Sequence, residues 1–219
     1  MKKKTIIAIV VVLLALALIV GGIMAYFTST DTATNTFTIG NVKIDLLEPA
    51  WTGAIATGED QPASAQNMVP GGSVAKDPKI QNIGTNDANV FMEVKIPVYT
   101  VGTGSAEQTG ELFTLNNLDT TNWKQVGTMT TDGVYNTYVY AYASGTTKDS
   151  LTDLAANVET TPLFTSVTLT TNEKIAEAAS VATGAAGDAG RSIVINAYGI
   201  QTTEVAGNTT ADVYGLFQH

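Results

Sequence analysis

The chain has 219 residues, with 11 Lys and Arg against 20 Asp and Glu, so its formal net charge is −9. It contains no cysteine, which excludes disulfide bonds, thiol catalysis and Cys-ligated metal sites. So acidic a surface repels nucleic acid and anionic lipid headgroups, and we expect neither as a partner.

Residues 1–25 have the pattern of a secretory signal peptide. Three lysines precede an apolar run from Ile6 to Ala25, and Gly21-Gly22 interrupts the helix just before the small residue Ala25. We expect cleavage between Ala25 and Tyr26 and a secreted product. The alternative is an uncleaved anchor, because about 20 apolar residues suffice to span a bilayer. Contact with a membrane is expected only through this uncleaved helix.

Residues 26–39, YFTSTDTATNTFTI, form a strand-like arm directly after the apolar run. Threonine occupies every even position from 28 to 38, and the arm has few apolar residues to bury by itself. Such a segment needs a sheet edge that lacks a strand. We expect it to insert into a neighbouring subunit as a donor strand; the alternatives are the first strand of its own sheet and a disordered arm. The expected donor-strand residues are Phe27, Thr28, Thr30, Thr32, Ala33, Thr34, Thr36, Phe37 and Ile39.

Residues 40–219 show the alternation of an all-β domain. In the clearest example, residues 88–100, the even positions from Val90 to Val98 are apolar and face one way, which predicts a core strand. Phe91, Glu93 and Lys95 face the other way. Further strands are expected at 37–46, with a bulge or a boundary at Gly40-Asn41, and at 73–84, 134–143, 162–170 and 191–203. Pro78 predicts that the 73–84 strand is broken or lies at a sheet edge.

One short helix is predicted at residues 172–182. Ile175, Ala178, Ala179 and Ala182 follow helical spacing, and Asn172 is a suitable N-cap. Together the elements predict a two-layer, jelly-roll-like β-sandwich with one short helix, preceded by a cleavable N-terminal signal helix. The predicted domains are a signal peptide (1–25), a donor-strand arm (26–39) and the sandwich (40–219).

Candidates for enzyme chemistry are few. The one histidine is His219, and the spacings H-E-x-x-H and G-x-S-x-G are absent. Glu59-Asp60 and the pair Asp149 and Asp153 are candidate calcium ligands, but loop solvation explains them better. We therefore expect no catalytic, cofactor-binding or metal-binding residues, and no enzyme activity.

Two further groups of side chains have alternative roles. Tyr138, Tyr140 and Tyr142 share one face of a strand, which favours a core face over a sugar-binding platform. Lys76, Lys79 and Lys95 are candidates for intramolecular Lys–Asn isopeptide bonds. Each such bond would lower the mass by about 17 Da, through loss of ammonia.

Several segments resemble one family. GGIMAYFTSTDTATNTFTIGNVKIDL (residues 21–46) is similar to the processing region of the TasA/camelysin family, and VPGGSVAKDPKIQNIGTNDANVFMEVKIP (residues 69–97) to its second conserved block. TPLFTSVTLT and IVINAYGIQTTEV resemble the closing strands. The resemblance implies cleavage by a SipW-type signal peptidase, a jelly-roll fold, and assembly into extracellular biofilm-matrix fibres by insertion of the mature N-terminus into the neighbouring subunit.

The functional expectation is a structural subunit or accessory of such a fibre. Its partners would be copies of itself in a head-to-tail homopolymer, or related matrix subunits, with no cofactor. The alternatives are a monomeric cell-surface adhesin or binding module, and a camelysin-like secreted peptidase.

Overall fold

The computed structural model describes residues 41–57, 61–181, 192–203 and 205–218, and Gly40–His219 form one compact unit. The predicted signal helix, the cleavage site at Ala25 and Tyr26, and the donor strand lie outside the described residues. The same holds for the predicted interruption at Gly40, so the choice between a bulge and a boundary stays open.

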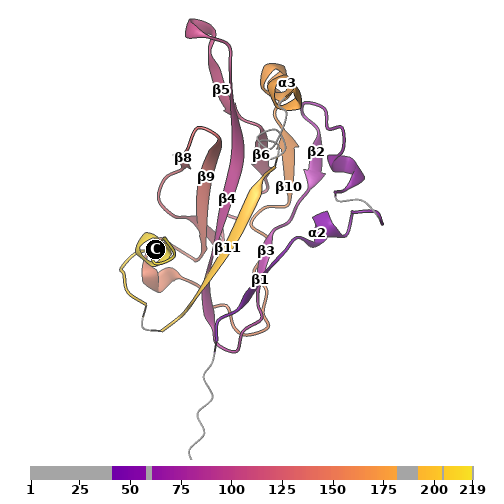
Figure 1. Cartoon of the computed structure of the whole chain (residues 1–219). Coiled ribbons are helices and arrows are strands. Elements are labelled where there is room, and N and C mark those ends of the chain that lie inside the picture. The colour runs from indigo at the N-terminus through magenta and orange to yellow at the C-terminus, as the bar shows by residue number, and fades with distance from the viewer. Residues whose placement is uncertain (1–40, 58–60, 182–191, 204, 219) are drawn as a thin grey trace, which may run out of the picture. The chain divides into compact units, whose positions relative to one another are not determined.

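The larger sheet is built around the core strand predicted from alternation. This strand, β4 (Ala88–Val101), pairs antiparallel with β11 (Val194–Gln201) on one side and with β9 (Tyr135–Tyr142) on the other (Figure 1). The strand order is β11-β4-β9-β7. The remaining members are β7 (Trp123–Gln125), β5 (Gln108–Glu111), which pairs with β4, and β8 (Thr130–Thr131), which pairs with β9.

The opposite layer consists of two smaller antiparallel sheets. One contains β1 (Ile44–Leu47) and β3 (Lys79–Asn82); the other has the order β2-β10-β6, formed by β2 (Ser73–Ala75), β10 (Ser166–Leu169) and β6 (Phe113–Asn116). The strand predicted at 73–84 is indeed broken at Pro78, and its halves, β2 and β3, belong to different sheets. Proline has no N–H to donate and ends the pairing there.

The main core lies between these layers. Val90, Met92, Val94 and Ile96 of β4 are buried against side chains of the opposite layer, including Val74, Ile80, Phe164 and Val167. This arrangement confirms the predicted all-β sandwich. Near one edge the layers approach closely at Gly199 of β11, where an added Cβ would lie 2.9 Å from Cγ2 of Ile44. Glycine is needed there because any larger residue would push β1 away.

The predicted helix is present as α3 (Glu173–Val181). Oδ1 of Asn172 accepts the backbone N–H groups of Lys174 at 3.2 Å and Ile175 at 3.4 Å, so Asn172 caps the helix as expected. The apolar face buries Ile175 and Ala179 against Leu112 and Leu169.

The predicted helix is not the only helical element in the described part of the chain. The described residues also form α2 (Pro49–Thr52), α5 (Thr210–Gly215) and three 3₁₀ turns: η1 (Ala63–Ala65), η2 (Gly104–Ala106) and η3 (Lys148–Ser150). These elements are too short to produce a helical hydrophobic period. None of the helices in the described ranges is long and apolar enough to cross a membrane.

Helix α5 covers the outer face of the larger sheet. A capping box of Thr209 and Asp212 starts it, and Val213 is fully buried. Val213 and Phe217 pack on Phe91 of β4. The side chain of Phe91 is also fully buried. Both faces of β4 are therefore covered, which explains why its second row of side chains is buried as well.

Candidate functional site

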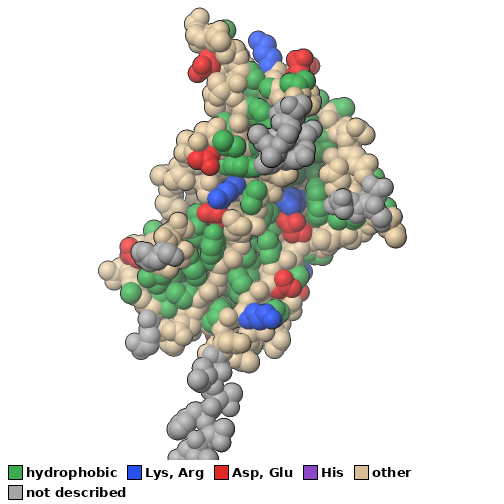
Figure 2. Space-filling model, in the orientation of Figure 1, with side chains coloured by type: hydrophobic (Ala, Val, Ile, Leu, Met, Phe, Trp, Pro, Cys, Tyr) green, Lys and Arg blue, Asp and Glu red, His purple; other side chains and the backbone are tan. Residues whose placement is uncertain are grey.

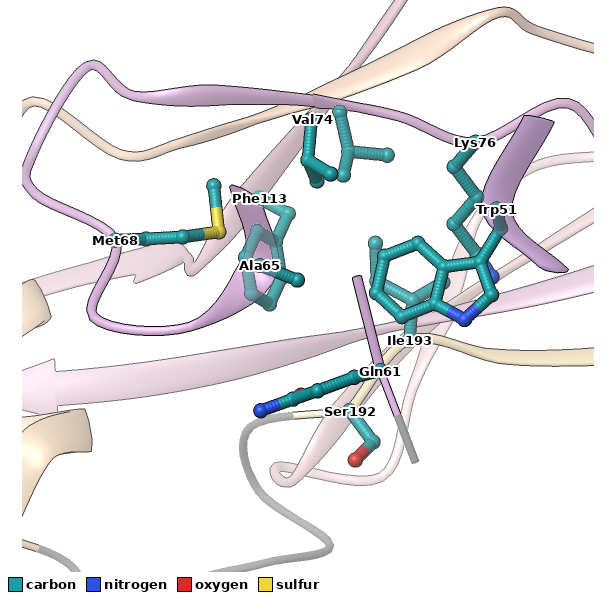
Figure 3. Close-up of a pocket in the computed structure, with 10 residues that line it drawn as sticks. Trp51, Gln61, Ala65, Met68, Val74, Lys76, Phe113, Ser192 and Ile193 are labelled. Atoms are coloured by element: carbon teal, nitrogen blue, oxygen red, sulfur yellow. The ribbon is translucent and has the colours of Figure 1, made fainter. Parts of the chain in front are cut away.

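An apolar cavity lies where the two layers of the sandwich end side by side. Among the described strands, β2 pairs only with β10 and β11 pairs only with β4, so each stands at the end of its sheet. Val74 of β2 and Ile193, the residue before β11, both line a cavity of about 290 Å³ (Figure 3). We call this cavity the β2–β11 groove.

The groove wall is mostly apolar. Trp51 of α2 and Met68 lie at opposite ends of it, with Val74 between them (Figure 3). The complete lining is Trp51, Gln61, Ala65, Met68, Val74, Lys76, Phe113, Val167, Ser192 and Ile193. Seven of these ten residues are apolar, and Gln61, Lys76 and Ser192 add polar groups to the wall.

A buried ion pair holds one side of the groove. Lys76 is 8% exposed, and its Nζ lies 2.7 Å from Oε1 and 2.8 Å from Oε2 of Glu48. The same Nζ lies 4.8 Å from the ring centroid of Trp51. Asp77 Oδ1 accepts the backbone N–H of Ala50 at 2.7 Å and so fixes α2, which carries Trp51. Because the lysine is paired, this wall presents no uncompensated charge to the groove.

Strand β11 has the composition of a strand that pairs readily. It reads VINAYGIQ, without a charged residue, and its residues from Val194 to Ile200 are all half-buried. Figure 2 shows hydrophobic side chains along the course of β11 in the orientation of Figure 1. Soluble proteins usually protect long apolar edge strands with charges, proline or a bulge. None of these protects β11 over Val194–Gln201, and no described strand covers its outer edge.

The predicted site residues divide into two groups. The cleavage residues Ala25 and Tyr26 and all of the donor-strand residues from Phe27 to Ile39 lie outside the described residues, so their pairing stays a prediction. Glu59-Asp60 lies outside them too. Asp153 is described, and its Oδ1 accepts Nδ2 of Asn89 at 2.9 Å, which gives it a structural partner.

The tyrosine row belongs to the core, as expected. Tyr140 is 5% exposed, and the ring of Tyr142 packs edge-on against Trp123 with centroids 5.2 Å apart. Tyr138 Oη donates to Oε1 of Glu111 at 2.6 Å. Burial, followed by the negative charge of Glu111, raises the pKa of Tyr140 to about 12. These rings therefore form no exposed platform for a sugar.

Each of the three candidate isopeptide lysines contacts a glutamate. Lys76 pairs with Glu48, Lys79 with Glu159, and Lys95 with Glu93. Only Glu93, among these three carboxylates, also accepts a hydrogen bond from an asparagine in the described part of the chain.

Sequence reasoning missed the groove because its parts come from separate segments. Trp51 and Met68 lie between the strands predicted at 37–46 and 73–84, where nothing in the local pattern marks them as neighbours of Ile193. A turn at Pro70-Gly71 closes this connection, with Gly71 at φ +81°. Turn chemistry is local and therefore predictable, whereas the meeting of two sheet ends depends on the whole topology.

Comparison with known proteins gives one match. The chain is similar to the family described as camelysin metallo-endopeptidase over residues 1–155. No curated protein and no solved structure matches the chain. The residues present do not fit the metal that this description implies. The sequence has one histidine and no cysteine, and within the described ranges no three His, Cys, Asp or Glu side chains lie together as a metal site would require.

Proposed function

This chain belongs to the TasA/camelysin family, which indicates an extracellular or cell-surface protein, and we propose that it is a structural subunit or accessory of an extracellular biofilm-matrix fibre. In this proposal residues 26–39 of one copy pair with the outer edge of β11 in the next copy. The observation that carries the proposal is the β2–β11 groove, where two sheet ends flank an apolar cavity.

The size and chemistry of the groove favour a strand as its occupant. Its volume of about 290 Å³ is at the lower limit of small-molecule pockets, roughly 300 Å³, and is large enough for apolar side chains. An added strand presents every second side chain to the same face. Phe27, Ala33 and Phe37 share one parity in the arm, and in this proposal the one that aligns with Ile193 enters the groove.

The length of the arm also fits. Fourteen extended residues at about 3.3 Å each span roughly 45 Å, whereas β11 has eight residues. The arm can therefore pair along the whole of β11 and leave several residues to connect the two copies. Main-chain hydrogen bonds would supply affinity, and the side chains in the groove would fix the register.

A contact between the arm of one copy and the edge of another is heterologous. Such contacts extend into a filament when the rotation between copies does not close a ring. Cleavage after Ala25 by a SipW-type signal peptidase would release the arm from the membrane helix. Processing would then act as the switch for assembly, without nucleotide or metal. The polymer would be a head-to-tail homopolymer or would include related matrix subunits.

The proposed role is not enzymatic. Zinc peptidases use a set of His and carboxylate ligands, and the single histidine of this sequence cannot supply the H-E-x-x-H pair. We therefore expect that purified protein does not hydrolyse casein and that a chelator does not change its assembly.

The test compares protein that starts at Tyr26 with protein that starts at Gly40, by negative-stain electron microscopy and sedimentation over a range of concentrations. A third protein, which starts at Tyr26 with Phe27→Ser and Phe37→Ser, keeps the arm but removes its largest groove-filling side chains. We expect filaments only from the first protein. Folded monomers from the first protein at all concentrations would contradict the proposal and favour a monomeric adhesin. Failure of the Gly40 form to fold would instead make the arm a strand of its own sheet.

A further inference from the structure

Three side chains with complementary chemistry meet on the face of the larger sheet that α5 covers. Nζ of Lys95, on β4, lies 3.4 Å from Oε1 of Glu93. Nδ2 of Asn196, on β11, donates to the same oxygen at 2.8 Å. Asn196 stands directly opposite Glu93 in the strand register, and Lys95 is two residues further along β4. A primary amine and a carboxamide thus contact one carboxylate oxygen.

The carboxylate is enclosed by aromatic rings. Glu93 is 8% exposed, and its Oε2 accepts a hydrogen bond from Oη of Tyr214 at 3.0 Å. The ring of Tyr214 lies 5.8 Å from that of Phe91 and 5.6 Å from that of Tyr198, measured between centroids. Little water reaches this carboxylate, so protons exchanged by the amine and the amide pass most directly through Glu93.

Lys95 is more exposed to solvent than Glu93, the carboxylate with which it pairs. Its side chain is 35% exposed, so a small leaving molecule can escape past it to solvent. The ion pairs of Lys76 with Glu48 and of Lys79 with Glu159 have no asparagine on the same carboxylate among the bonds of the described residues. The structure therefore distinguishes Lys95 from the other two lysines.

We infer that Lys95 and Asn196 become joined by an intramolecular isopeptide bond, with Glu93 as the proton carrier. Glu93 takes a proton from the Lys95 ammonium, and the neutral Nζ attacks Cγ of Asn196. The Cγ–Nδ2 bond then breaks. Two protons pass to Nδ2, one from the attacking nitrogen and one from Glu93. Nδ2 therefore leaves as an ammonium ion, and the carboxylate of Glu93 is restored. No oxidant, cofactor or metal is required.

The bond would fix the edge strand of the sheet. Strand β11 pairs with β4 alone among the described strands, and a covalent link to β4 would prevent its separation under tension. This inference concerns one chain and does not depend on fibre assembly.

The experiment is mass spectrometry of the full chain after folding and denaturation, combined with protease digestion. We expect a mass about 17 Da below that of the sequence, corrected for the observed N-terminus. Digestion should also yield a branched peptide that joins the segments containing Lys95 and Asn196. Both signals should disappear in Lys95→Arg, Asn196→Ala and Glu93→Gln. The matched control, Lys79→Arg, should keep both signals. Glu159, the partner of Lys79, accepts no hydrogen bond from an asparagine among the described residues.

Three results would overturn the inference. The first is folded wild-type protein at its full mass. The second is a deficit of about 17 Da without a branched peptide, which indicates a succinimide at an asparagine. The third is a deficit that persists in Lys95→Arg. Because the lysine side chain is partly exposed, Lys95→Arg should fold normally, and the test does not rest on the buried Glu93.

Discussion

Val74 of β2 and Ile193, the residue before β11, line the same cavity, although β2 and β11 belong to different layers of the sandwich. Among the described strands, β2 and β11 each lie at the end of their sheet. In most sandwiches the outermost strands are protected against further pairing. Here the two ends meet across an apolar groove, which is the arrangement that a strand from another molecule requires.

The groove predicts the effect of Ile193→Asp. A carboxylate in the groove would have to be desolvated when the aromatic residues of the arm enter, so assembly should require at least about ten-fold more protein, or about 1.4 kcal/mol per contact. Ile193 is only half-buried, so the fold should lose less than about 2 kcal/mol. Sedimentation measures the first effect and urea unfolding the second.

The matched control is Val158→Asp. Val158 is 46% exposed and does not line the groove. This variant gains the same charge elsewhere on the unit and should assemble as the wild type does. Equal weakening by both variants would attribute the effect to net charge and would count against the groove.

The contact between β4 and the C-terminal helix predicts a large loss of stability in Phe91→Ala. The Phe91 ring is fully buried against Tyr214 and Phe217. Its removal leaves a cavity that should cost about 3–5 kcal/mol. Urea unfolding followed by tryptophan fluorescence would measure this. A loss below about 1 kcal/mol would mean that α5 does not cover this face in solution. The exposed Val134→Ala should change stability by no more than about 0.5 kcal/mol.

The strands that could be predicted from the sequence are those in which apolar and polar residues alternate within the strand itself. Residues 88–100 alternate cleanly and form almost all of β4. Asn172 caps α3 because its side chain reaches the next backbone N–H groups. The second face of β4 was harder to interpret. The charged residues Glu93 and Lys95 would indicate a face exposed to solvent. Only the packing of Tyr214 and Phe217, more than a hundred residues later in the chain, shows that this face is covered.

The groove and the Glu93 cluster could not be predicted for the same reason. Trp51, Val74 and Ile193 become neighbours through pairings between distant strands. Likewise, Asn196 meets Glu93 only because β11 pairs with β4 in one particular register. A shift of one residue would turn Asn196 to the other face. The signal for α5 was present in the sequence, as Thr209 and Asp212 at capping-box spacing, but the helix is only six residues long.

The pKa of Tyr140 predicts part of the response to alkali. Its folded-state pKa is raised to about 12, and an unfolded tyrosine ionises near 10. The contribution of Tyr140 to the free energy of unfolding is fully present below a pH of about 10 and is lost as the pH rises through the folded-state pKa. Stability of the wild type should therefore fall more steeply between pH of about 10 and 12 than that of Tyr140→Phe, by about 2–3 kcal/mol in total. Urea unfolding at successive pH values measures both slopes, and parallel profiles would contradict the assignment.

The most direct test of the central claim is amide hydrogen exchange of β11 in the protein that starts at Tyr26, below and above the concentration at which it assembles. We expect alternate amides of Val194–Gln201, those that point away from β4, to become protected on assembly. The amides already bonded to β4 should be protected in both states. Filaments in which the β11 amides exchange as fast as they do in the monomer would contradict pairing of the arm with β11, because the contact between copies would then lie elsewhere.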